Sequence, residues 1–113
     1  MQHRDKTILV KITSELDIAL EMIKNINFNA FEANEIIKRA VCMTVINIGE
    51  LVKALSDDFR NNNKHIPWRN IAGFRDIAAH KYQTLNMSDV YQTVTNDFPE
   101  LRKKIQDILT HNQ

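Results

Sequence analysis

The sequence predicts an all-α fold, a four- to five-helix up-and-down bundle formed by a single domain over residues 1–113. Apolar residues recur at steps of three and four along most of the chain, and no segment alternates with the period of two that a β-strand requires. Only two Gly and two Pro occur, and the 43% hydrophobic and 26% charged residues leave no stretch with the composition of a linker.

The first half of the chain predicts two long helices. Residues 5–25 carry one apolar stripe, formed by Ile8, Ile12, Leu16, Ala19 and Ile23. Residues 31–55 carry a second stripe, formed by Ile37, Val41, Thr44, Ile48, Leu51 and Leu55. Residues 56–65 are rich in Asp and Asn and lack periodicity, which predicts a surface loop between two halves of the bundle.

Pro67 suits the first turn of a third helix, which we expect to end between residues 80 and 83. The spacing predicts that its inward face carries Ile71, Phe74, Ala78 and Lys81. Ser88 is the predicted N-cap of a fourth helix that continues to Ile108. Pro99 should kink this helix, or break it in two, near Phe98, because proline removes a backbone hydrogen bond and clashes with the preceding turn.

Composition excludes several classes of function. No apolar run approaches the roughly 20 residues of a membrane span or the core of a signal peptide, so we expect a cytoplasmic protein without a membrane partner. Gly49 and Gly73 are too far apart to build a phosphate-binding loop. The four histidines lack the spacing of zinc ligands, so neither a metal nor another cofactor is expected. Cys42 fits a buried structural thiol better than a nucleophile.

Charge is distributed unevenly although the formal net charge is only +1. Residues 60–82 contain five basic side chains, at positions 60, 64, 69, 75 and 81, and a single acidic one, Asp76. This excess of positive charge fits a surface that binds nucleic-acid phosphates. A solvent-exposed basic face without a ligand explains it equally well.

One segment, residues 73–82, concentrates polar chemistry at the end of a predicted helix. At about 100° per residue, Arg75 and Tyr82 fall within about 20° of each other, on a line with Ala72 and Ala79. His80 lies about 140° from Arg75, so the two meet only if the helix unwinds or a second subunit contributes. Asp76, four residues before His80, is placed to hold the imidazole by a hydrogen bond.

These residue types suit metal-free RNA cleavage, in which the ribose 2′-hydroxyl attacks the adjacent phosphate. His80 would handle the proton and Arg75 would stabilise the charge that develops on the phosphorus oxygens. The alternative is purely structural, with His80 as a helix cap, Arg75 in a surface ion pair and Tyr82 in packing.

The spacing Arg75, four residues, His80, one residue, Tyr82 resembles the Arg-x4-His-x-Tyr signature of HEPN-domain toxins of the HepT type, the DUF86 family. Further parts of the chain resemble the same family in order and spacing, namely residues 48–50, 55–56, 66–68, 71–73 and the helix that contains Pro99. The resemblance covers nearly the whole chain.

The resemblance implies a HEPN-like homodimer whose two signatures face a shared cleft and cut RNA without metal. It implies a type VII-like toxin-antitoxin pair, in which a minimal nucleotidyltransferase antitoxin adds AMP to the signature tyrosine. Carried onto this chain, Arg75 and His80 are catalytic, Tyr82 is the modification site, and Asp76 fills the polar position after the arginine. Glu50 and Asn47 share one helix face and are weaker candidates for the same cleft.

Two further interpretations stay open from the sequence. The chain could be a non-catalytic HEPN module that presents the same cleft to a nucleotide or to a nucleotidyltransferase, or a dimerising bundle without chemistry. Trp68 could stack on a base, although an aromatic residue near a helix start more often belongs to the core.

Overall fold

Four long helices form the body of the protein, and short helices join them. The computed structural model describes residues 1–111. The long helices are α1 (His3–Ile23), α3 (Glu35–Ala54), α5 (Trp68–His80) and α7 (Phe98–His111). The connecting elements are α2 (Phe28–Ala33), α4 (Asp57–Asn62), a 3-10 turn at Tyr82–Thr84, α6 (Met87–Gln92) and a π-helical turn at Thr93–Asp97. The described residues contain no strand, which confirms the all-α prediction.

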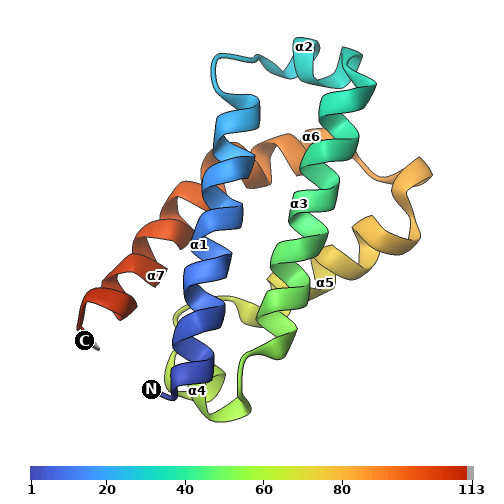
Figure 1. Ribbon diagram of the computed structural model, residues 1–113. Helices are drawn as coiled ribbons and strands as arrows, with labels where there is room; N and C mark the ends of the chain where they lie inside the picture. The colour runs from blue at the N-terminus through green and yellow to red at the C-terminus, as the bar shows by residue number, and fades with distance from the viewer. Residues whose placement is uncertain (112–113) are drawn as a thin grey trace.

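Helix α3 lies at the centre of the arrangement. It packs against α1 on one side and α5 on the other, while α7 packs against α1 (Figure 1). The predicted stripe of α1 is buried along its whole length, and buried apolar side chains from all four long helices contribute to one core cluster. Within residues 1–111, no helix is both long enough and apolar enough to cross a bilayer.

The predicted helix over residues 31–55 is divided at Asn34. The backbone of Asn34 is extended, and its side-chain oxygen accepts a hydrogen bond from the Ile37 N–H at 3.0 Å. Asparagine competes well for such capping positions, because its side chain satisfies a donor that the first helical turn leaves free. Phe31 therefore belongs to α2 and not to α3.

The predicted surface loop over residues 56–65 is also wrong, because it contains α4. Ser56 caps this helix by accepting a hydrogen bond from the Phe59 N–H at 3.1 Å. The carboxylate of Asp5, which is buried, accepts from the Ser56 N–H at 2.8 Å and from the Ser56 hydroxyl at 2.7 Å. The start of α4 is thus tied to the start of α1 through a satisfied buried carboxylate.

The last two helices follow the prediction with one correction. Asn86, and not Ser88, caps α6, since its side-chain oxygen accepts from the Ser88 N–H at 2.9 Å and the Asp89 N–H at 3.2 Å. The expected disturbance near Phe98 is confirmed as the π-helical turn, after which α7 begins at Phe98. Pro99 lies at the second position of α7, where its missing N–H is tolerated.

Candidate active site

Helix α5 carries the signature residues, and its contact with α3 fixes Arg75. The two helices approach most closely at Gly49, where an added Cβ would overlap Arg75 Cβ and lie 2.5 Å from Arg75 Cγ. Only glycine leaves room for the arginine stem at this point. The Arg75 side chain, which is 20% exposed, forms an ion pair with Glu50 one residue further along α3.

Replacing Gly49 with alanine should destabilise the protein by about 1–3 kcal/mol, because the methyl group forces α3 and α5 apart. Gly73 provides the matched control, since a Cβ there meets nothing within 4 Å. Gly73→Ala should stabilise α5 by about 0.5–1 kcal/mol. Urea unfolding of the two variants measures both effects, and equal stabilities would contradict the close approach at Gly49.

Arg75 belongs to a network of two cations and two carboxylates. Asp76 Oδ1 accepts from Lys53 Nζ at 2.6 Å and from Arg75 Nη1 at 3.1 Å. The hydrogen bond from Lys53, followed by that from Arg75, lowers the pKa of Asp76 below its ordinary value. The carboxylate is therefore ionised at neutral pH, and Asp76 and Glu50 each pair with one terminal nitrogen of the guanidinium. The predicted hydrogen bond between Asp76 and His80 is replaced by these contacts.

His80 is the last residue of α5, and its side chain is exposed. Since α5 stays helical up to His80, the angle of about 140° between His80 and Arg75 is retained, with about 7.5 Å between them along the helix axis. Arg75 and His80 therefore point to different sides of α5 in one chain. The inward face of α5 is confirmed for Ala78, which is buried, but Lys81 is exposed and ends the helix.

Tyr82 does not share a line with Arg75, because the helix ends before it. Tyr82 lies in the 3-10 turn, and its hydroxyl donates to Glu35 Oε1 at 3.1 Å. Glu35 and Glu50, the α3 partners of Tyr82 and Arg75, are fifteen positions apart, which corresponds to about 22 Å along the helix. The predicted common face of Arg75 and Tyr82 is thus wrong within one chain.

Two cations, Lys38 and Arg39, lie near Tyr82 and pair with its partner Glu35. Glu35 forms salt bridges with Lys38 at 3.2 Å and with Arg39 at 2.8 Å, and the Arg39 guanidinium lies 5.1 Å from the centre of the Tyr82 ring. Burial, and then the bond to Glu35, raises the pKa of Tyr82, so the phenol stays protonated at neutral pH. The hydrogen bond from Lys38, followed by that from Tyr82, lowers the pKa of Glu35.

Sequence reasoning missed the partners Glu35, Arg39 and Lys53. The sequence contains a cue for Glu35 and Arg39 but none for Lys53. Asn34 before Glu35 is typical of a helix start, and Glu35 with Arg39 has the spacing of an ion pair on one helix face. Nothing in the spacing of one sequence connects Lys53 with Asp76.

The remaining candidates separate into two groups. Asn47 and Glu50 line one hollow between α1 and α3, where Asn47 Nδ2 donates to Glu15 Oε1 at 3.4 Å, and only Glu50 contacts Arg75. Trp68 is 6% exposed and packs against Phe59, which confirms the core interpretation. Cys42 is 2% exposed, and burial raises the pKa of its thiol to about 11, as expected for a structural cysteine.

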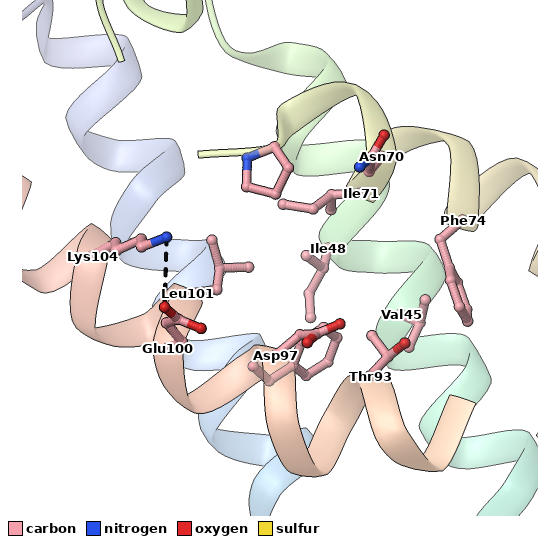
Figure 2. A pocket seen from close by; sticks show the side chains of 12 residues that line it. Val45, Ile48, Asn70, Ile71, Phe74, Thr93, Asp97, Glu100, Leu101 and Lys104 are labelled. Carbon is pink, nitrogen blue, oxygen red and sulfur yellow. Dashed lines mark ion pairs between the residues drawn. The ribbon is translucent and has the colours of Figure 1, made fainter. Parts of the chain in front are cut away.

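A separate cavity of about 240 Å³ lies between α3, α5, the π-helical turn and α7 (Figure 2). Its wall is mainly apolar, with Ile48, Phe74 and Leu101 among the side chains, and Lys104 pairs with Glu100 at its edge. None of the signature residues lines it. Among the described residues, no three His, Cys, Asp or Glu side chains come together as a set of metal ligands.

Comparison with known proteins gives a consistent result. The family model described as "Ribonuclease HepT-like" matches residues 12–108, which include Arg75, His80 and Tyr82. A protein named "Putative RNase" from Caldanaerobacter subterraneus subsp. tengcongensis is 35% identical, over 89% of this chain and 90% of its own length. A protein from Methanocaldococcus jannaschii that is also named "Putative RNase" is 34% identical, over 96% of this chain and 95% of its own length.

The "Probable ribonuclease HepT" of Thermococcus cleftensis is 29% identical, over 96% of this chain and 98% of its own length. No solved structure matched the chain. The family model covers most of the chain, and two of these relatives exceed 30% identity over nearly their full lengths. The chain therefore belongs to the ribonuclease HepT-like family.

Proposed function

We propose that this protein is an endoribonuclease that cleaves RNA without a metal ion, through Arg75 and His80. The observation that carries the proposal is the family match over residues 12–108, in a chain that retains the complete arginine, histidine and tyrosine signature. Two relatives that match the chain over almost their whole lengths are named putative RNases, which supports RNA cleavage.

The chemistry assigned to each residue follows from its side chain. The ribose 2′-hydroxyl attacks the adjacent phosphorus, the bond to the 5′-oxygen of the next nucleotide breaks, and a proton moves from the first oxygen to the second. The exposed imidazole of His80 carries the proton, because histidine accepts and donates near neutral pH. Arg75 stabilises the negative charge on the phosphate oxygens, and Glu50 and Asp76 orient its guanidinium.

A homodimer is part of the proposal, because one chain does not bring the two groups together. Arg75 and His80 point to different sides of α5, so His80 of a second copy is needed beside Arg75. Apolar side chains that a partner would cover are exposed on the same pair of helices. Ile77 on α5 is 51% exposed, and Met43 on α3 is 57% exposed.

We also propose a nucleotidyltransferase antitoxin as the partner, with AMP attached to Tyr82. Tyr82 lines an open hollow of about 380 Å³ together with Glu35 and Lys38. A nucleotide can reach the hydroxyl from this hollow, and the cations Lys38 and Arg39 suit a phosphate group beside it. The pairing of toxin and antitoxin itself comes from the family resemblance.

A second function, a non-catalytic module that binds a nucleotide or the partner enzyme, is favoured by one observation. The charge of Arg75 is compensated by Glu50 and by Asp76, so an incoming phosphate must compete with two carboxylates. A catalytic arginine is more often left free for its substrate.

Incubation of the purified dimer, two chains of 13.2 kDa, with single-stranded RNA separates the two functions. Fragments ending in a cyclic phosphate should accumulate at the same rate with and without EDTA. Cleavage that EDTA abolishes would contradict the metal-free mechanism. RNA or nucleotide binding without cleavage would establish the non-catalytic module.

A further inference from the structure

A basic groove lies between the end of α3, α4 and the start of α5. Its volume is about 670 Å³, and its charged walls are formed by Lys53, Asp57, Arg60, Lys64 and Arg69. Among the described residues, four cationic side chains and one carboxylate thus line the groove, in a protein whose formal net charge is only +1. Neither the apolar cavity nor the hollow beside Tyr82 concentrates charge in this way.

The cations of this groove are only partly neutralised. Arg60 pairs with Asp57 at 2.5 Å, and Lys53 pairs with Asp76 at 2.6 Å. In residues 1–111, no salt bridge joins Lys64 or Arg69 to an acidic residue, and both side chains are exposed. Two positive charges therefore remain available to an anion that enters the groove.

The walls of the groove suit a phosphate backbone better than a base. Among residues 1–111, Trp68 is the only aromatic residue that lines the groove. It is 6% exposed, and its indole N–H donates to the Asn63 carbonyl at 3.0 Å. The ring therefore offers no open face for stacking. A ligand with repeated negative charge and no need for a specific base matches this lining.

Asp76 connects the groove to Arg75. Arg69, Ala72 and Asp76 follow one another on a single stripe of α5, and the first two of them line the groove. Asp76 contacts both Lys53, which lines the groove, and Arg75, which lies outside it. Arg69 precedes Arg75 by six residues, which corresponds to about 9 Å along the helix and about 120° around it.

We infer that this groove binds the phosphate backbone of single-stranded RNA next to the scissile bond, with Lys64 and Arg69 as its main contacts. The inference rests on the proposed ribonuclease function and adds the path by which the substrate reaches Arg75. Binding through phosphates makes the groove insensitive to base sequence and sensitive to salt.

The test compares the double variant Lys64→Gln/Arg69→Gln with the control Lys24→Gln/Lys103→Gln, which removes two exposed positive charges away from the groove. The probe is single-stranded RNA with 2′-O-methyl groups, which cannot be cleaved. Loss of two phosphate contacts should weaken binding about tenfold at 0.15 M salt and lower the slope of log Kd against log salt by about 1.4. With cleavable RNA, KM should rise and kcat should stay unchanged.

The outcomes distinguish failure of the groove from failure of the ribonuclease function. Wild-type affinity and salt slope in the groove variant, or equal losses in the control, would overturn the groove while RNA cleavage by the wild type upholds the enzyme. A wild-type protein that neither binds nor cleaves RNA would overturn the groove and the ribonuclease together. A groove variant that loses only its binding to the antitoxin would show a protein interface instead, and would also overturn the inference.

Discussion

Replacing His80 or Arg75 with alanine should lower the rate of RNA cleavage by about 10²- to 10⁴-fold while the helical content stays unchanged. His80 is exposed at the end of α5, so its removal leaves no cavity. Loss of the imidazole removes the proton carrier, and loss of the guanidinium removes the charge beside the phosphate. Single-turnover cleavage of a fixed RNA measures both, and circular dichroism checks the fold.

The controls separate catalysis from charge and stability. His3→Ala removes an exposed imidazole at the start of α1 and should cleave at the wild-type rate. Arg75→Ala also leaves Glu50 without its cation, so Arg75→Lys is the sharper variant, since it keeps the charge and loses the planar donor group. A His80→Ala protein that cleaves at the original rate would remove His80 from the mechanism.

Mixing the two inactive variants tests the shared site. If each site combines Arg75 of one chain with His80 of the other, a mixed dimer of His80→Ala and Arg75→Ala chains contains one site with both wild-type residues and one with neither. Activity should therefore return when the two proteins exchange subunits. No recovery in a mixture shown to exchange would contradict a site shared between two chains.

The sequence predicted the long helices well because their burial is periodic. The stripe from Ile8 to Ile23 is buried as expected, and Pro99 disturbs the backbone where predicted. Both signals are local and strong, since apolar spacing fixes a helix face and proline lacks an N–H. The inward position expected for Lys81 failed because α5 ends there.

The short helices were missed because capping residues and loop residues are the same types. Asn34, Ser56 and Asn86 each cap a helix through a side-chain oxygen. In a sequence such residues indicate a turn as readily as a helix start. What decides for α4 is the contact between Ser56 and the buried carboxylate of Asp5, fifty-one positions away, which no local pattern contains.

In the candidate site, too, local patterns identified residues but not their distant contacts. The motif identified Arg75, His80 and Tyr82, but the contacts that hold them come from distant parts of the chain. Tyr82 and Glu35 are forty-seven positions apart, and Asp76 and Lys53 are twenty-three apart. Extending the helix through Tyr82 placed it beside Arg75, and the observed end of α5 moves it to the other end of α3.

Replacing Tyr82 with phenylalanine should leave RNA cleavage largely intact and abolish inhibition by the nucleotidyltransferase and ATP. The ring keeps its packing below Arg39, and only the hydroxyl that donates to Glu35 is lost. In the proposed modification of the wild type, that oxygen would attack the α-phosphorus of ATP, an O–P bond would form, pyrophosphate would leave, and the phenolic proton would pass to a base of the partner enzyme.

We expect the proposed modification to inhibit cleavage because Tyr82 follows His80 closely in the chain. His80 and Tyr82 are two positions apart in sequence, whereas Arg75 of the same chain contacts α3 about 22 Å from the Tyr82 contact. Each added AMP would place a negative phosphate and a nucleoside near the imidazole, where they would repel and block the RNA phosphate. The nearby Lys38 and Arg39 can transfer from Glu35 to the new phosphate and hold it there.

Mass spectrometry of protein co-expressed with the nucleotidyltransferase should show AMP-sized additions on the peptide that contains Tyr82. Tyr91, the other tyrosine, serves as an internal control, because its hydroxyl donates to the Ile26 carbonyl at 2.5 Å and should stay unmodified. A fully silenced complex with unmodified Tyr82 would show that the antitoxin acts by covering the site. Additions without loss of cleavage would instead show that charge beside His80 does not exclude RNA.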